Sequence, residues 1–193
     1  PDNRSQAEAR LRSMAGKFRR NPNTYQDYAN SIEGYMNKGF AEPVPQDQIN
    51  GCKGRTFYLM HHGVRHPRKS KIRVVFNAAA EYKGVALNAL IRECPDLLES
   101  IIGIILRFRR EPIVIAADID AFFHAVEMAP SDRDMHRFLW FDDIKMTRIV
   151  HYRMVSFIFG GTASQACSIV ARNQALIDAV SAQILSASQS HEA

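Results

Sequence analysis

A run of five apolar residues, Ile113–Ala117, constrains the fold of this chain more than any other feature. Pro112 precedes the run, and Asp118 and Asp120 follow it. A short continuous apolar stretch between turn signals is typical of a strand buried in the middle of a sheet. The sequence therefore predicts a buried strand that delivers Asp118 to the edge of a groove, where divalent metal ions could find hard oxygen ligands. The alternative is that Asp118 caps the next helix.

Periodic patterns predict the elements on either side of this run. Apolar residues recur at helical spacing from Tyr25 to a stop at Gly39. Residues 56–61 and 71–78 read as two strands of a hairpin with a basic turn at 63–70. The remaining expected elements are a helix over 95–108, strands over 136–141 and 152–157, and a long helix over 164–185. The predicted fold class is α+β, with an antiparallel sheet backed by helices.

Charge is distributed unevenly along the 193 residues. Residues 1–73 carry 14 Lys and Arg against 6 Asp and Glu, whereas residues 74–193 carry 11 against 14. A basic first part favours a polyanionic partner such as nucleic acid. Three widely spaced cysteines fit neither a disulfide framework nor a zinc site. The chain has neither an apolar run of membrane-spanning length nor an apolar secretory signal, so we expect no membrane association and a cytoplasmic location.

Eight stretches of the sequence follow one another in an informative order. They are NPNTYQDYANSIEGYMNKGFAEPV at 21–44, FYLMHHGV at 57–64, KIRVVFNAAA at 71–80, LN at 87–88, ILRFRREPIVIAADIDAFFHAV at 105–126, PSDRD at 130–134, RFLWF at 137–141 and YRMVSFIFGGTAS at 152–164. In this order and spacing the chain resembles the reverse transcriptases of BEL/Pao-type LTR retrotransposons over residues 21–180. The resemblance implies a reverse-transcriptase-like fold that is incomplete. Its expected parts are a mobile basic lead-in at 1–23, a fingers-like region at 24–111, a partial palm at 112–186 and a frayed tail at 187–193.

The resemblance implies a catalytic and metal-binding role for Asp118, which matches the first metal-binding aspartate of the polymerase. The backbone carbonyl of Ile119 is a further expected ligand of Mg²⁺, and Asp120 has at most a supporting role. Phe123 matches the bulky residue that excludes a ribose 2′-OH from the nucleotide site. Its alternative role is core packing.

The resemblance also implies nucleotide-binding and template-binding residues. Arg73 matches the arginine that holds the triphosphate, and its planar fork suits phosphate oxygens. Lys71 lies two residues earlier on the same strand face and adds a positive charge. Gly160 and Gly161 match a turn that packs against the nascent base pair. The cations expected to contact template phosphates, with a solvated basic turn as the alternative, are Arg65, Arg68 and Lys69.

The expected reaction is template-directed addition of dNTPs to a primer 3′-OH with two Mg²⁺ ions. The implied partners are an RNA or DNA template-primer, the dNTP and the remainder of a retroelement polyprotein, in the cytoplasm or a virus-like particle. Two-metal catalysis needs carboxylates from at least two segments. No pair of aspartates follows Gly161, and Asp142-Asp143 precedes it and is expected to form a strand-end turn. We therefore expect this nucleotidyltransferase fragment to be inactive alone; the alternative is a basic nucleic-acid-binding remnant without catalysis.

Overall fold

The computed structural model describes residues 2–50, 54–65, 71–110 and 112–189, and it has a mixed α+β fold with small antiparallel sheets. The α-helices are α1 (Arg4–Arg20), α2 (Pro22–Asn37), α3 (Leu87–Leu90), α4 (Ile101–Phe108) and α5 (Ser164–Gln189), with 3-10 turns η1 (Gln46–Gln48) and η2 (Arg133–His136). The strands are β1 (Ala41–Pro43), β2 (Met60–Arg65), β3 (Ile72–Asn77), β4 (Glu81–Tyr82), β5 (Val85–Ala86), β6 (Arg137–Phe141) and β7 (Ile149–Met154).

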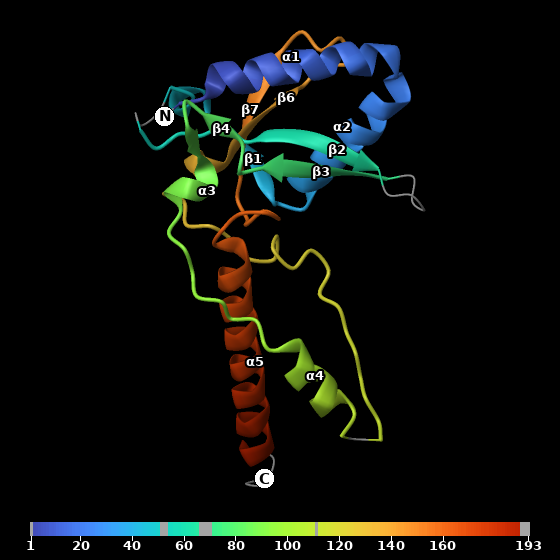
Figure 1. The fold of residues 1–193 in the computed structure, drawn as a ribbon, viewed down its shortest axis with the longest axis vertical. Helices are drawn as coiled ribbons and strands as arrows, with labels where there is room; N and C mark the ends of the chain where they lie inside the picture. Colours follow the sequence, from blue (N-terminus) through green and yellow to red (C-terminus); the bar gives the residue numbers. More distant parts are fainter. Residues whose placement is uncertain (1, 51–53, 66–70, 111, 190–193) are drawn as a thin grey trace.

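The strands form three antiparallel sheets (Figure 1). The largest has the order β1-β7-β6, and β2-β3 and β4-β5 are two-stranded hairpins. The predicted basic hairpin is confirmed, although its first strand begins at Met60 and extends to Arg65. The predicted pair of later strands is confirmed as β6 and β7. Asp143 caps the turn between them, because its carboxylate accepts hydrogen bonds from the backbone N–H groups of Thr147 and Arg148.

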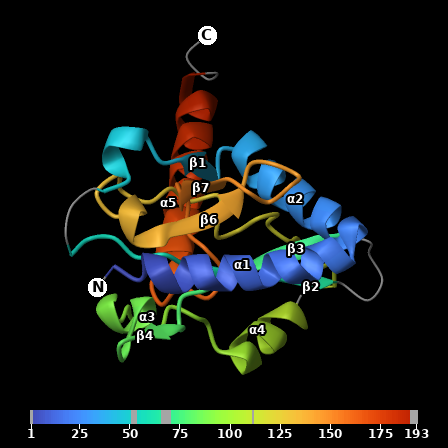
Figure 2. The same cartoon turned by 90° about the horizontal axis from the view of Figure 1, so that it is seen from above.

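Helix α1 occupies the region for which the sequence predicted a mobile lead-in. Its buried side chains recur every three or four residues, and they are Ala7, Leu11, Met14, Ala15 and Phe18. This spacing gives the helix one apolar stripe, which packs against β6 and α2 (Figure 2). The six Lys and Arg residues at other positions give the segment a polar composition. For this reason the sequence analysis did not detect the apolar stripe of a helix. Asn3 ties the helix start to the core, since its side chain makes hydrogen bonds of 2.8 and 2.6 Å with the backbone of Tyr58.

Helix α2 begins and ends as the sequence predicted. The side chain of Asn21 accepts a hydrogen bond from the Thr24 N–H (3.2 Å), and Pro22 follows in the first turn. Gly39, with φ of +71°, ends the helix. The helix packs so closely on β2 that a Cβ at Gly63 would lie 2.9 Å from the ring of Tyr28. A glycine is therefore needed where β2 passes beneath α2.

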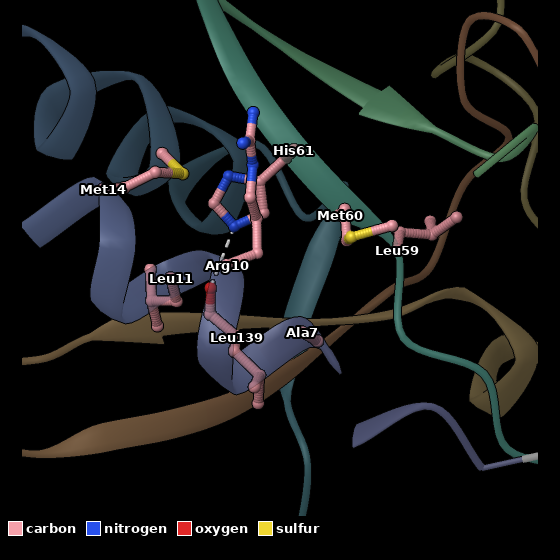
Figure 3. A pocket seen from close by; sticks show the side chains of 8 residues that line it. All are labelled: Ala7, Arg10, Leu11, Met14, Leu59, Met60, His61 and Leu139. Carbon is pink, nitrogen blue, oxygen red and sulfur yellow. Dashed lines mark hydrogen bonds between the residues drawn. The ribbon is translucent and has the colours of Figure 1, made fainter. Parts of the chain in front are cut away.

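His61 lies where α1, α2, the hairpin β2-β3 and the sheet β1-β7-β6 meet. Its Nε2 donates a hydrogen bond to the Leu139 carbonyl (2.9 Å), and its Nδ1 accepts one from the Tyr28 hydroxyl (2.5 Å). Figure 3 shows the ring pointing from β2 towards Leu139, with Leu11 and Met14 of α1 beside it. Both ring nitrogens are thus engaged inside the core, and burial lowers the pKa of His61 to about 4.

A buried arginine joins the long connection after β1 to the main sheet. The Arg137 side chain is fully buried and donates to the carbonyls of Gln48 (2.7 Å) and Ile49 (2.8 Å). Its Nε donates to Asp134 (3.0 Å), which also accepts from Arg153 (3.1 Å). Burial tends to raise the pKa of Asp134, but the hydrogen bonds from the two arginines outweigh it and hold the pKa below its usual value. Because the charge of Arg137 is paired and hydrogen-bonded, its burial is tolerated.

The predicted buried strand over Ile113–Ala117 is wrong. These residues form no strand and are exposed, with Ile113 82% and Ile115 89% accessible. They lie on a long irregular segment that runs from the end of α4 back to the body of the molecule (Figure 1). An apolar run becomes a strand only where a neighbouring strand satisfies its backbone groups, and within the described residues no strand pairs with it.

Helix α4 is shorter than predicted. Residues 95–100 lie outside any helix, so α4 covers only Ile101–Phe108, and its apolar side chains are exposed. The predicted long helix is confirmed as α5, which buries Ala166 and Ile169 near its start but exposes Leu176, Ile177 and Val180. Among the described helices, none combines the length and apolar content required to cross a membrane.

We predict that stability falls as the pH is lowered from about 6.5 to 4. Burial lowers the pKa of His61 to about 4, and burial with the nearby charges of Arg4 and Arg137 lowers the pKa of His151 to about 4. In the unfolded chain a histidine binds a proton at about pH 6.5, whereas the folded chain resists protonation until about pH 4. Each histidine therefore removes up to about 1.4 kcal/mol of stability per pH unit within this window. Urea unfolding across this pH range measures the effect.

The substitution His61→Gln should remove the share of the pH dependence that His61 contributes and leave that of His151. His62→Gln, at the exposed neighbouring position, is the matched control. An unfolding free energy with the same pH dependence in His61→Gln and the wild type would contradict the assignment.

Candidate functional site

A cavity of about 1020 Å³ lies between α2, the hairpin β2-β3 and the segment that follows Ile119. It is lined by Asp27, Asn30, Ser31, Gly34, Tyr35, Lys38, Phe40, Val64, Lys71, Arg73, Val74, Val75, Phe76, Asp120, Ala121, His124 and Phe159. The cavity is at the upper end of the size range of about 300–1,000 Å³ that is usual for small-molecule sites. It combines apolar and charged side chains from elements far apart in the sequence.

One wall of the cavity carries cations that β3 positions. Strand alternation buries Ile72, Val74 and Phe76 and leaves Lys71 and Arg73 exposed. Lys71 and Arg73 border the cavity, as do the edges of Val74 and Phe76. The structure therefore brings the two predicted phosphate-binding side chains together.

Of the three predicted template contacts, the structure describes only Arg65. Arg65, at the end of β2, is 2.8 Å from the carboxylate of Asp27 on α2. Its guanidinium thus fastens the hairpin to the helix. Arg68 and Lys69 lie outside the described residues.

Of the two aspartates in the Asp118–Asp120 segment, Asp120 lines the cavity and Asp118 does not, and Asp27 of α2, paired with Arg65, is a second carboxylate at the cavity wall. Asp118 is exposed on the irregular segment, so the prediction that a buried strand presents it is wrong. Ile119 is likewise 48% exposed. Asp120 precedes Ala121, whose φ of +52° is uncommon for a residue with a side chain. Asp120 therefore lies directly before a left-handed residue, and both line the cavity.

An aromatic pair borders the same end of the cavity. Phe159, 70% exposed, lines the cavity and meets Phe123 edge to face, with ring centroids 5.6 Å apart. Phe123 also contacts Phe122 at 5.4 Å. Phe123, which was predicted to exclude a ribose 2′-OH, therefore contacts Phe159 but does not line the cavity. The ring of Phe159 lines the cavity instead.

His124 is a cavity residue that the sequence analysis missed. Its ring stacks on Phe40 at 5.0 Å and meets Tyr35 edge to face at 5.3 Å. Its Nδ1 donates a hydrogen bond to the Phe157 carbonyl (2.7 Å), and burial lowers its pKa. The sequence offered only the position of His124 four residues after Asp120, and the segment between them is a turn and not a helix.

Asn88 fixes the diglycine turn that precedes α5, and the sequence analysis assigned it no role. Its amide nitrogen donates to the Gly160 carbonyl (3.0 Å), and its amide oxygen accepts from the Thr162 N–H (3.1 Å). Gly160 has a φ of +88°, which a glycine adopts without strain. A Cβ at Gly161 would lie 2.6 Å from the hydroxyl oxygen of Ser164. The turn is thus held in one conformation by polar contacts and by close approach.

The described residues supply only part of a ligand set for a metal ion. Among them, no three His, Cys, Asp or Glu side chains gather at one place. Asp120 lines the cavity and Asp118 lies two residues before it. One or two carboxylates fit Mg²⁺ only when phosphate oxygens of a substrate complete its shell.

Comparisons with known proteins do not place the chain in a family. No protein-family model and no curated protein sequence matches it.

We predict that Asn88→Ala loosens the diglycine turn. The substitution removes two side-chain hydrogen bonds, which contribute about 1 kcal/mol each to stability. Amide hydrogen exchange at Thr162 should become faster, and the free energy of unfolding should fall by about 1–2 kcal/mol. Asn173→Ala, at an exposed position on α5, is the control. Unchanged exchange at Thr162 would show that the turn does not depend on Asn88.

Proposed function

We propose that this cavity binds a deoxynucleoside triphosphate and that the chain contributes fingers and part of a palm to an RNA-directed DNA polymerase. The observation that carries the proposal is the placement of Lys71 and Arg73 in one cavity with Asp120. Cations alone fit any phosphate, and a carboxylate alone fits many ligands. Their combination suits a triphosphate that arrives with Mg²⁺.

Each cavity residue has a role in this proposal. The Arg73 guanidinium binds phosphate oxygens in two-point fashion, and Lys71 adds a compact positive charge. Asp120, with Asp118 as the nearby second carboxylate, holds Mg²⁺ together with the triphosphate. A bound Mg²⁺ supplies charge neutralisation on the phosphoryl group that is transferred. Phe159 offers an exposed ring for packing against the nucleotide.

The order of the elements supports the polymerase part of the proposal. A helix (α2), the basic hairpin β2-β3, the Asp118–Asp120 segment, the β6-β7 pair and a diglycine turn follow one another as in the reverse transcriptases that the sequence resembles. In this proposal the reaction is template-directed addition of dNTPs to a primer 3′-OH. The exposed apolar residues of α4 and of Ile113–Ile115 support association with the remainder of a polyprotein.

The proposal predicts that Arg73→Ala weakens binding of a fluorescent dNTP analogue by roughly ten- to hundredfold, because a hydrogen bond to a charged group contributes about 1.5–3 kcal/mol. Fluorescence anisotropy in the presence of Mg²⁺ measures the affinity. Arg172→Ala, which removes an exposed arginine on α5, should bind as the wild type does.

The variant Asp120→Asn tests the proposed metal contact separately from the phosphate contacts. It should weaken binding when Mg²⁺ is present and have little effect in EDTA, and Asp118→Asn tests the neighbouring carboxylate in the same way. Equal affinity of Arg73→Ala and the wild type would overturn the proposal. Salt-sensitive binding of nucleic acid with no binding of dNTP would instead favour a non-catalytic remnant.

We further predict that the 193-residue chain does not extend a primer by itself. Asp118 and Asp120 come from a single segment, and two-metal catalysis needs converging carboxylates from at least two. A primer-extension assay with template-primer, dNTPs and Mg²⁺ tests this. Robust synthesis that is lost in Asp118→Asn would contradict the prediction.

A further inference from the structure

Helix α1 carries many positively charged side chains, and none of them lines the cavity described above. Its sequence holds six Lys and Arg residues, and its one acid, Glu8, pairs with Arg4 at 2.9 Å. Arg12, Lys17 and Arg19 are exposed, and none of them lines the cavity. The helix lies along the outer edge of the molecule (Figures 1 and 2), so its exposed face is accessible over its length.

The exposed cations lie on two sides of α1. Arg12 and Arg19 are seven residues apart and lie on one side of the helix about two turns apart, and Lys17 lies on the other side. Arg10 lines a small cavity beside His61 and is not part of this surface (Figure 3). With 3.6 residues per turn, the two sides flank the face opposite to the buried stripe.

The side chains on the exposed face of α1 indicate which kind of polyanion can bind there. A helix that inserts into a membrane surface needs a free apolar face, and the apolar stripe of α1 is buried in the core. Single-stranded nucleic acid is bound largely by stacking on aromatic rings, and Phe18, the one aromatic residue of α1, is buried. Binding to the phosphate backbones of a nucleic-acid duplex requires only cations at a suitable spacing.

We propose that the exposed face of α1 binds B-form duplex DNA, with Arg12 and Arg19 on one side and Lys17 on the other contacting the phosphate backbones that border the major groove. That groove is about 12 Å wide, and an α-helix with its side chains is about 10–12 Å across. The deep, narrow major groove of A-form RNA does not admit a helix. Phosphate contacts carry no sequence information, so the binding is independent of sequence.

The test is the salt dependence of binding to a labelled DNA duplex of random sequence. The variant R12Q/K17Q/R19Q should lower the slope of log affinity against log salt concentration by about 2 to 3, because each lost phosphate contact contributes about 0.9. The variant R92Q/K145Q/R172Q removes the same charge from exposed positions outside α1 and should keep the wild-type slope. An equal fall in both variants would overturn the proposal in favour of net charge alone.

Two further measurements decide the ligand and use the unmodified chain. Duplex DNA should protect Lys17 from acetylation by an amine-reactive reagent, as measured by mass spectrometry, and leave Lys145 reactive. An A-form RNA duplex should bind more weakly than DNA. Equal protection of both lysines, equal affinity for duplex RNA, or binding only to anionic lipid vesicles would each refute the assignment. Because dNTP binding to the cavity is measured separately, failure of either proposal is distinguishable from failure of the other.

Discussion

The Trp140 ring holds the body of this molecule together. It stacks on Tyr28 at 4.9 Å and on Tyr25 at 5.9 Å, both from α2, and meets Phe18 of α1 edge to face at 5.8 Å. The His61 ring of β2 lies 6.0 Å away. One side chain on β6 therefore joins two helices and the basic hairpin, and the cavity exists because α2 and the hairpin are fixed to the same ring. Such aromatic contacts contribute beyond the area that they bury.

The elements that the sequence predicted correctly are those whose partners are local. The hairpin β2-β3, the pair β6-β7 and the capped helix α2 each satisfy most of their backbone groups within a short stretch of chain. Ile113–Ala117 has a strong apolar pattern but forms no strand, because strand formation depends on a neighbour that the pattern does not encode. Helix α1 is the opposite case, since its polar composition obscured a regular apolar stripe.

The candidate site was predictable in its residue types and less so in its geometry. Lys71 and Arg73 reach the cavity because strand alternation is a local rule. Asp120 lines the cavity in place of Asp118 because the segment before it is irregular, and no residue preference indicates that course or the left-handed conformation of Ala121. Asn88 acts through hydrogen bonds to a turn more than 70 residues away in the sequence, and only the folded chain brings them together.

The contacts of Asn88 have a mechanical consequence. Its backbone N–H is bonded to the Ala78 carbonyl just after β3, and its side chain holds the turn that leads into α5. These contacts join the hairpin to the first turn of α5 without involving the exposed segment around Ile115. Helix α5 has 26 residues and is about 39 Å long. Because the helix is exposed over residues 172–183, beyond its first turns, the geometry of this one turn determines where its far end lies.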